Sequence, residues 1–279
     1  MGDLLLVGGF GMGAAGAAVA TVFAQAVSVA ISYLMIRRRP LPFAFGASFI
    51  RPRWRDIGMT LRLGVPIALQ DLLVNISFLA ILAIVNSLGL SESAGVGVAE
   101  KVCGFIMLLP SAYMQAMAAF VSQNIGAGKP ERARRALLCG VLTSFSAGVV
   151  MFYLTFFHGD LLAGIFSKDA PIVALAHEYL KAYAIDCLLT AFLFCFIGYF
   201  NGLGKTTFVM LQGIIGGIGV RLPLSFLFSR ITPVSLFHIG MATPASTVLQ
   251  IVLCGVYFTI VLAAERKAVG RGEYSLSEG

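Results

Sequence analysis

The sequence predicts an all-α integral membrane protein with seven full transmembrane helices and one partial helix ahead of them. Hydrophobic residues make up 58% of the 279 residues and charged residues 12%, against roughly 45–50% and about 25% in a soluble domain. The 20 lysines and arginines fall mainly between the apolar runs rather than on an aromatic-rich surface, so a nucleic-acid partner is not expected. The lipid bilayer is the expected surroundings.

Seven apolar runs reach the length of about 20 residues that a membrane-spanning helix needs. They are residues 14–36, 63–88, 93–123, 136–157, 172–203, 205–228 and 239–263. The third and fifth runs are longer than a span requires and should tilt or project from the bilayer. The apolar run at residues 3–11 is too short to cross and is expected to form the partial helix.

The basic residues orient these spans. Fifteen of the 20 lysines and arginines lie in the segments that follow the first, third, fifth and seventh runs, whereas the opposite loops hold only Lys168 and Arg230. The positive-inside rule therefore predicts that the basic segments and the C-terminus are cytoplasmic, with the protein in the inner (plasma) membrane.

The segment from Val121 to Ala133 reads VSQNIGAGKPERA and separates the third and fourth runs. Gly126 and Gly128 favour the end of one helix, and Pro130 favours the start of the next. The segment resembles the "GQNIGAGRPERA" loop of the multidrug and toxic compound extrusion (MATE) transporters, with Ser122 in place of the usual glycine. In that family the loop occurs once in each half of a twelve-helix transporter.

Other parts of the chain resemble the same family. Residues 11–25 are similar to its sixth helix, residues 64–70 to the start of its seventh, residues 201–204 to the end of its tenth and residues 221–224 to its eleventh. The resemblance implies that residues 1–38 end an N-terminal lobe, 39–62 form a cytoplasmic linker, 63–264 form a complete six-helix C-terminal lobe and 265–279 form a cytoplasmic tail. We therefore expect a fragment of a longer transporter, whose N-terminal lobe would be its partner.

The resemblance implies secondary active efflux of cationic or amphiphilic small molecules by proton- or sodium-coupled antiport, with no cofactor other than the coupling ion. A flippase of lipid-linked precursors, from the same wider superfamily, is the second hypothesis. A flippase would need a cavity rich in arginine and lysine, and only Arg221 lies at mid-membrane depth. An intramembrane enzyme would need a nucleophile or metal cluster at depth, which the sequence does not indicate.

Ionisable side chains within spans are costly and are therefore candidates for ion or substrate binding. Asp71 falls about 12 Å from the cytoplasmic end of its helix, at 1.5 Å per residue. Gln70, Asn75 and Asn86 extend a polar stripe along this helix, which fits either a helix contact or the wall of an aqueous cavity. Family members of one subgroup carry a glutamate in this helix, at a position that aligns with Val74.

Asp186 and Arg221 fall at similar depth on consecutive antiparallel helices, which predicts an ion pair between them. On this basis Asp71 is predicted to exchange the coupling proton, while Asp186 stays ionised. Gln115 completes the set of candidate cation- and substrate-binding residues. Glu100, Lys101 and Lys181 are interpreted as structural residues that reach the interface.

Two further features bear on the cavity. Four glycines between residues 213 and 219, followed by Pro223, predict that the sixth full helix kinks or breaks. Bulky side chains at Met107, Tyr113, Met114, Met117 and Phe145 are candidates for lining a cavity for apolar cations. No metal site is expected, because the cysteines lie in apolar runs without metal-ligand spacing and the three histidines map near the outer surface.

Overall fold

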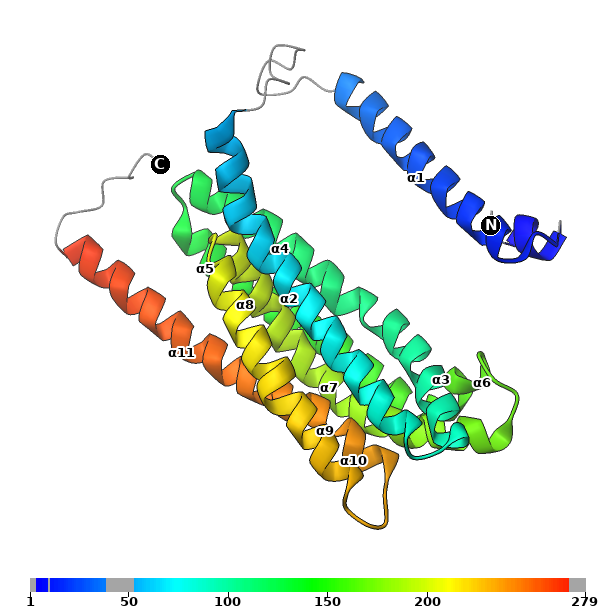
Figure 1. Cartoon of the computed structure of the whole chain (residues 1–279). Coiled ribbons are helices and arrows are strands. Elements are labelled where there is room, and N and C mark those ends of the chain that lie inside the picture. Colours follow the sequence, from blue (N-terminus) through cyan, green and yellow to red (C-terminus); the bar gives the residue numbers. More distant parts are fainter. Residues whose placement is uncertain (1–3, 10, 39–52, 271–279) are drawn as a thin grey trace. The chain divides into compact units, whose positions relative to one another are not determined.

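The computed structural model describes residues 4–9, 11–38 and 53–270. Every regular element in these ranges is a helix, which confirms the predicted all-α class. The chain divides into two units, Met1–Ile57 and Gly58–Gly279. The helices, shown in Figure 1, are η1 (Leu4–Gly9), α1 (Gly13–Arg38), α2 (Trp54–Asn86), α3 (Leu90–Ile106), α4 (Leu108–Gly126), α5 (Pro130–Phe157), α6 (Gly159–Gly164), α7 (Ala170–Gly202), α8 (Thr206–Ile214), η3 (Ile215–Arg221), α9 (Leu222–Ser229), α10 (Leu236–Gly240) and α11 (Ala242–Gly270).

Seven helical segments in the described residues are long and apolar enough to span a bilayer, as predicted. They are 13–38, 54–86, 90–126, 130–157, 170–202, 206–229 and 236–264. The short π-helix η1 precedes the first of them, where a partial helix was expected. Most of the predicted linker and tail, residues 39–52 and 271–279, lie outside the described residues.

Helix α2 begins at Trp54 rather than near residue 63, so the basic residues predicted to lie in the linker at Arg53, Arg55 and Arg62 precede or occupy its first turns. The helix continues through Pro66, which has no N–H to donate to the carbonyl of Arg62. A proline therefore marks the point where this helix enters its most apolar part.

The third span is divided into α3 and α4 at Met107, a break that the sequence analysis did not predict. Pro110 explains it, because a proline there cannot donate the helical hydrogen bond to the carbonyl of Ile106. The backbone N–H of Met107 still bonds to Cys103 (2.9 Å), and that of Ser111 bonds to Met107 (3.1 Å). The break places the side chain of Met107 among cavity-lining residues.

The loop between α4 and α5 ends one helix and starts the next, as its sequence predicts. Gly128 adopts a positive φ of 69°. The N–H of Lys129 bonds to the carbonyl of Asn124 (2.8 Å), and that of Gly128 bonds to Ile125 (3.0 Å). This is the Schellman pattern of helix termination, in which glycine takes the left-handed position. Gly204 ends α7 in the same way.

Helix α7 is the centre of the second unit and packs against α3, α4, α5, α6, α8, α10 and α11 (Figure 1). Two apolar clusters surround it. One gathers around Tyr179 and Tyr183, and the other around Tyr199 and Phe200. Between them, α7 carries the buried polar residues Asp186 and Thr190. The polar middle of α7 is therefore the part of the core where a solvated site can form.

The sixth full helix is interrupted by the π-helix η3, in agreement with the predicted irregularity of its glycine-rich part. The hydroxyl of Ser246 on α11 donates to the carbonyl of Gly216 (2.7 Å), and Gln250 Nε2 donates to Ser246 Oγ (3.0 Å). A Cβ at Gly216 would lie 2.3 Å from Gln250 Nε2. The absence of a side chain at Gly216 therefore permits this polar contact between η3 and α11.

Candidate functional site

Five of the predicted site residues line one cavity of about 390 Å³ in the second unit. Gln70 and Asp71 come from α2, Gln115 from α4, Asp186 from α7 and Arg221 from η3. Further polar groups line the same cavity: Ser111, Tyr183, Thr190, Thr243, Thr247 and Gln250. Residues up to 180 positions apart in the chain thus line one space, in which α4 and α11 pack against α7 and η3 packs against α11.

Asp186 is the most deeply buried carboxylate of this cavity, with only 2% of its surface exposed. Its Oδ1 has no hydrogen-bond partner among the described residues. Thr247 of α11 lines the same cavity, and its hydroxyl donates to the backbone carbonyl of Thr243 (3.1 Å). A buried carboxylate oxygen without a partner is costly in a packed interior, and it is an available ligand for a cation.

Arg221 is also buried, with 6% of its surface exposed. Its Nη1 donates to Ser77 Oγ on α2 (3.3 Å), and its guanidinium lies 4.5 Å from the centre of the Phe78 ring. In the described part of the chain no nitrogen–oxygen contact within 4.0 Å joins Arg221 to Asp186.

The predicted ion pair is therefore not formed. The guanidinium of Arg221 contacts Ser77 and Phe78 of α2 instead of Asp186 of α7. Arg221 still acts on Asp186 electrostatically through the shared cavity. Asp186 is therefore not held in an ion pair, so the reason for preferring Asp71 over Asp186 as the coupling carboxylate does not apply.

Asp71 lies on the exposed side of α2, and Gln70 beside it is 9% exposed. Gln70 packs against α8, where a Cβ at Gly213 would lie 2.9 Å from Gln70 Cγ. Asn75 Nδ2 donates to the backbone carbonyl of Asp71 (2.7 Å). The carboxylate of Asp71 therefore faces an accessible part of the cavity, in contrast to that of Asp186.

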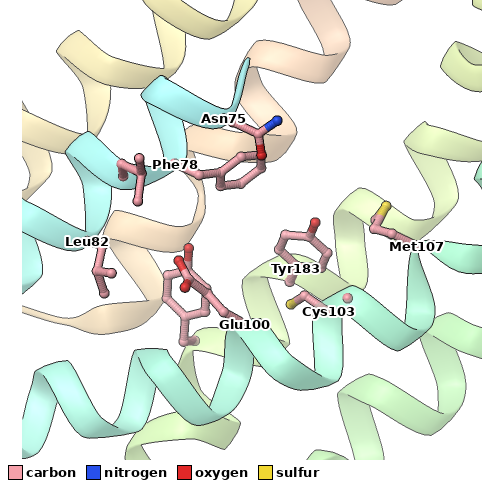
Figure 2. Close-up of a pocket in the computed structure, with 10 residues that line it drawn as sticks. Asn75, Phe78, Leu82, Glu100, Cys103, Met107 and Tyr183 are labelled. Carbon is pink, nitrogen blue, oxygen red and sulfur yellow. The ribbon is translucent and has the colours of Figure 1, made fainter. Parts of the chain in front are cut away.

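Asn75 lines a neighbouring cavity of about 420 Å³, which shares Phe78, Met107 and Tyr183 with the first. Figure 2 shows that Asn75 and Phe78 of α2 lie across this cavity from Glu100 of α3. Glu100, interpreted from sequence as a structural residue, is thus a cavity residue. The two neighbouring cavities together are lined by three carboxylates, those of Asp71, Glu100 and Asp186.

Asn86 is the predicted site residue that does not join the others. It is exposed at the end of α2 and accepts a hydrogen bond from the hydroxyl of Ser93 on α3. Its contact is with the short connection between the two helices, since the polar stripe of α2 leaves the cavities before it reaches residue 86.

Among the bulky side chains considered from sequence, Met107 and Met114 line the central cavity. Tyr113 and Met117 line a separate groove between α4 and α5, and Phe145 packs against Phe192 at 5.2 Å between ring centres. Sequence reasoning missed the contribution of α11. Thr243, Thr247 and Gln250 recur at spacings of four and three residues, which is the pattern of one polar helical face.

The donors in the cavity are oxygen-rich: two carboxylates, several hydroxyls and amide groups, balanced by one guanidinium. Among the described residues, no cluster of three or more His, Cys, Asp or Glu side chains has the geometry to hold a metal ion. The arrangement fits a singly charged cation or a proton, which carboxylate, hydroxyl and carbonyl groups accommodate in membrane transporters.

A protein-family model described as MatE matches residues 66–227, which is more than half of the 279 residues. The chain belongs to the MatE family. This is a family of membrane transporters rather than enzymes, and the seven candidate spans agree with a multi-pass membrane protein. The matched range holds α2 from Pro66 to α9, and so includes every predicted site residue.

Known MatE relatives match over most of this chain. The probable multidrug resistance protein YoeA of Bacillus subtilis is 24% identical over 264 residues, covering 92% of this chain and 57% of that protein. The probable multidrug resistance protein NorM of Xanthomonas campestris pv. campestris is 28% identical over 230 residues, covering 80% and 50%. The chain spans about half the length of the curated relatives it matches.

A solved structure shows the same MatE fold. An outward-facing multidrug resistance MATE family transporter aligns with a TM-score of 0.85 at 17% sequence identity, over 94% of this chain and 59% of that one. The helices of this chain are therefore arranged like about half of a MATE transporter.

Proposed function

We propose that this chain forms the ion- and substrate-binding lobe of a secondary active transporter, which exports cationic or amphiphilic small molecules in exchange for protons or sodium ions. The observation that carries the proposal is the central cavity, where Asp186 is buried with an unpartnered oxygen and Asp71 is accessible. The names of the relatives, which describe multidrug resistance proteins, support the same class of substrate.

The coupling ion binds at Asp186 in this proposal. The hydroxyls of Thr190, Thr243 and Thr247 and the amide of Gln250 line the same cavity. Thr190 Oγ1 donates to the backbone carbonyl of Asp186 (2.9 Å), while Thr243 Oγ1 is without a partner among the described residues. These oxygens can ligate a sodium ion, and the carboxylate alone can take a proton.

The organic cation binds nearer to Asp71, at the accessible side of the cavity. Phe194 and Tyr183 supply aromatic faces that attract cations, whereas the ring of Phe78 already faces Arg221. Met107 and Met114 supply flexible thioether side chains, which adapt to substrates of different shape. A transporter for several bulky cations needs this combination of charge and adaptable apolar surface.

Exchange follows because ion and substrate use carboxylates in one space. A cation at Asp186 lowers the negative charge available to a second cation at Asp71, so the two ligands compete. Transport additionally needs a change in access between the two sides of the membrane. We propose that a second six-helix lobe, as in the twelve-helix transporters, takes part in that change.

A flippase for lipid-linked precursors is the less favoured alternative. Such a substrate carries phosphate groups and would need an excess of basic side chains. The central cavity holds one guanidinium and two carboxylates, which favours a cationic substrate over an anionic one.

We propose that the protein lies in the plasma membrane with the loop between α4 and α5 and the C-terminus in the cytoplasm, on the basis of the asymmetry of basic residues. Cysteines introduced at the exposed positions Ser91 and Lys129 test this. In a cysteine-free protein, an impermeant maleimide added outside the cell should label the first and not the second. The reverse labelling pattern would show that the orientation is inverted.

The experiment that tests the proposed function is equilibrium binding of tetraphenylphosphonium to the purified chain. Sodium ions or a lower pH should weaken binding by about tenfold, equivalent to about 1.4 kcal/mol. Asp186→Asn should abolish this sensitivity. Asp160→Asn, which changes an exposed carboxylate on α6, is the matched control and should retain it.

Two results would contradict the proposal. The first is that neither sodium ions nor a lower pH weakens tetraphenylphosphonium binding, either in the unchanged chain or in Asp186→Asn. Ion and substrate would then not compete, and antiport would have no basis. Displacement of the cation by a soluble isoprenyl pyrophosphate, but not by sodium or protons, would favour the flippase.

A further inference from the structure

A groove of about 560 Å³ lies between α4 and α5, apart from the central cavity. Its α4 wall consists of Tyr113, Ala116, Met117 and Phe120, which follow the spacing of a single helical face. Its α5 wall, with the same helical spacing, consists of Arg132, Arg135, Ala136, Cys139 and Gly140. The groove is therefore built from two facing stripes of a helical hairpin.

The charges of the groove are at one end. The helices are joined by the short loop between Gly126 and Pro130, so Phe120, Arg132 and Arg135 lie toward the loop. Tyr113 and Gly140 lie at the far end. At 1.5 Å per residue, the apolar part of the groove extends about 10 Å along the helices. This is a basic end followed by an apolar channel.

In the part of the chain that the structure describes, neither arginine of the groove is engaged by another side chain. Among the described residues, no hydrogen bond or ion pair involves the guanidinium of Arg132 or Arg135. The acidic residue of the first turn of α5 is Glu131, and it pairs with Arg134 (2.7 Å) rather than with either of them. Both arginines are exposed. Two cationic groups thus remain available beside an apolar surface.

We propose that this groove binds an anionic phospholipid, with the phosphate at Arg132 and Arg135 and an acyl chain along Tyr113, Met117 and Phe120. Guanidinium groups bind phosphate with two parallel hydrogen bonds. The half-exposed ring of Phe120 (42%) and the exposed side chain of Cys139 provide the apolar contact. An organic cation would be repelled by the two arginines, and a soluble phosphate would leave the apolar channel unfilled.

A single tryptophan placed in the groove provides a site-specific test. In a Trp54→Phe background, which removes the chain's one native tryptophan, Phe120→Trp reports on the basic end. The protein is reconstituted in phosphatidylcholine vesicles that contain increasing fractions of brominated phosphatidylglycerol or, separately, brominated phosphatidylcholine. Bromine quenches the fluorescence of a tryptophan only when the lipid is in contact with it.

Brominated phosphatidylglycerol should bind beside the groove tryptophan up to about thirtyfold more strongly than brominated phosphatidylcholine, because each basic side chain near a membrane surface contributes about 1 kcal/mol. Arg132→Gln with Arg135→Gln should remove this preference. The matched control, Arg53→Gln with Arg55→Gln, changes two arginines outside the groove and should retain it.

A second control places the sole tryptophan at Val150, which is 57% exposed on α5 but lies outside the groove. Its quenching should show no preference for either lipid. Should the double arginine variant fail to fold, the difference between the tryptophans at positions 120 and 150 still decides the matter.

Three outcomes would overturn the proposal. Equal quenching by both lipids at position 120 would reduce the groove to an unspecific apolar surface. No quenching there by either lipid would show that protein, such as another lobe, covers it. Displacement of the brominated phosphatidylglycerol by soluble glycerol phosphate would show that the site recognises phosphate rather than lipid.

Discussion

Helices α2 and α7 both contain 33 residues and each supplies a carboxylate to the central cavity, yet they differ sharply in burial. Four residues of α2 are buried, namely Gln70, Ser77, Ile81 and Val85, against sixteen of α7. The buried residues of α2 form one narrow stripe, whereas those of α7 surround the helix. The cavity is therefore built between a fixed central helix and a peripheral one.

This difference assigns different roles to the two carboxylates. Asp186 is held in place by a helix that contacts most of the second unit. Asp71 is on a helix whose contacts with its neighbours include a few side chains, such as Gln70 against α8 and Ser77 and Phe78 against Arg221. A structural element with few buried contacts opens at lower free-energy cost than one in the core. In the proposed transport function, the Asp71 side of the cavity is therefore the one that we expect to change.

The largest effect on stability is expected from Arg221→Leu. This change removes the Arg221 contacts with Ser77 and Phe78 and the positive charge that faces Asp186 across the cavity, and we expect the free energy of unfolding to fall by about 3 kcal/mol. Thermal unfolding in detergent, followed by circular dichroism, measures it. Adding Asp186→Asn to the same protein should restore most of the loss if the two charges interact across the cavity. Equal destabilisation with and without the second change would mean that Arg221 stabilises the fold only through α2.

A smaller effect is expected from adding a methyl group to one glycine of each helix. A Cβ at Gly198 of α7 would lie 2.4 Å from the carbonyl oxygen of Met114, whereas one at Gly64 of α2 meets no described atom within 4 Å. Gly198→Ala should therefore destabilise the protein by about 1–3 kcal/mol.

Gly64→Ala is the matched control and should stabilise the protein by up to about 1 kcal/mol, because alanine favours a helix more than glycine does. The unfolding temperatures of both variants are compared with that of the unchanged chain. If both variants shifted the unfolding temperature equally, α7 would not be more tightly packed than α2.

The helices themselves were predictable from the sequence, because a bilayer requires long apolar runs and the runs are separated by basic loops and glycines. Gly126 and Gly128 ahead of Pro130 correctly indicated where one helix stops and the next begins. The sequence also allowed five polar residues to be predicted as site residues, because each lies inside a span. The structure places all five in one cavity: Gln70, Asp71, Gln115, Asp186 and Arg221.

The details of the site depend on contacts between helices, which a sequence does not list. The sequence predicts that Arg221 lies at the depth of Asp186. It does not predict that Arg221 contacts Ser77 and Phe78, on a helix more than 140 residues away in the chain. The hydrogen bond from Ser246 to the π-helix carbonyl of Gly216 was hidden for the same reason. Irregular backbone and its partner groups form together, so neither can be read from one segment alone.

The smallest effect on stability is expected from Asp71→Asn, and this change separates function from folding most clearly. Asp71 is exposed and an amide keeps the shape of the side chain, so the free energy of unfolding should change by less than about 0.5 kcal/mol. Binding of tetraphenylphosphonium should nevertheless weaken by about tenfold, since one of the two negative charges that attract the cation is removed.

Salt and ion dependence distinguish this loss from that caused by Asp186→Asn. Because Asp71 is accessible, salt should screen its attraction for the cation. The ionic strength is raised with a salt whose cation does not compete for the site. The difference in tetraphenylphosphonium affinity between Asp71→Asn and the unchanged chain should then become smaller. Sensitivity to sodium or protons should survive in Asp71→Asn but not in Asp186→Asn. If Asp71→Asn abolished that sensitivity while Asp186→Asn retained it, the peripheral helix would carry the coupling ion, and the two carboxylates would exchange the roles proposed for them.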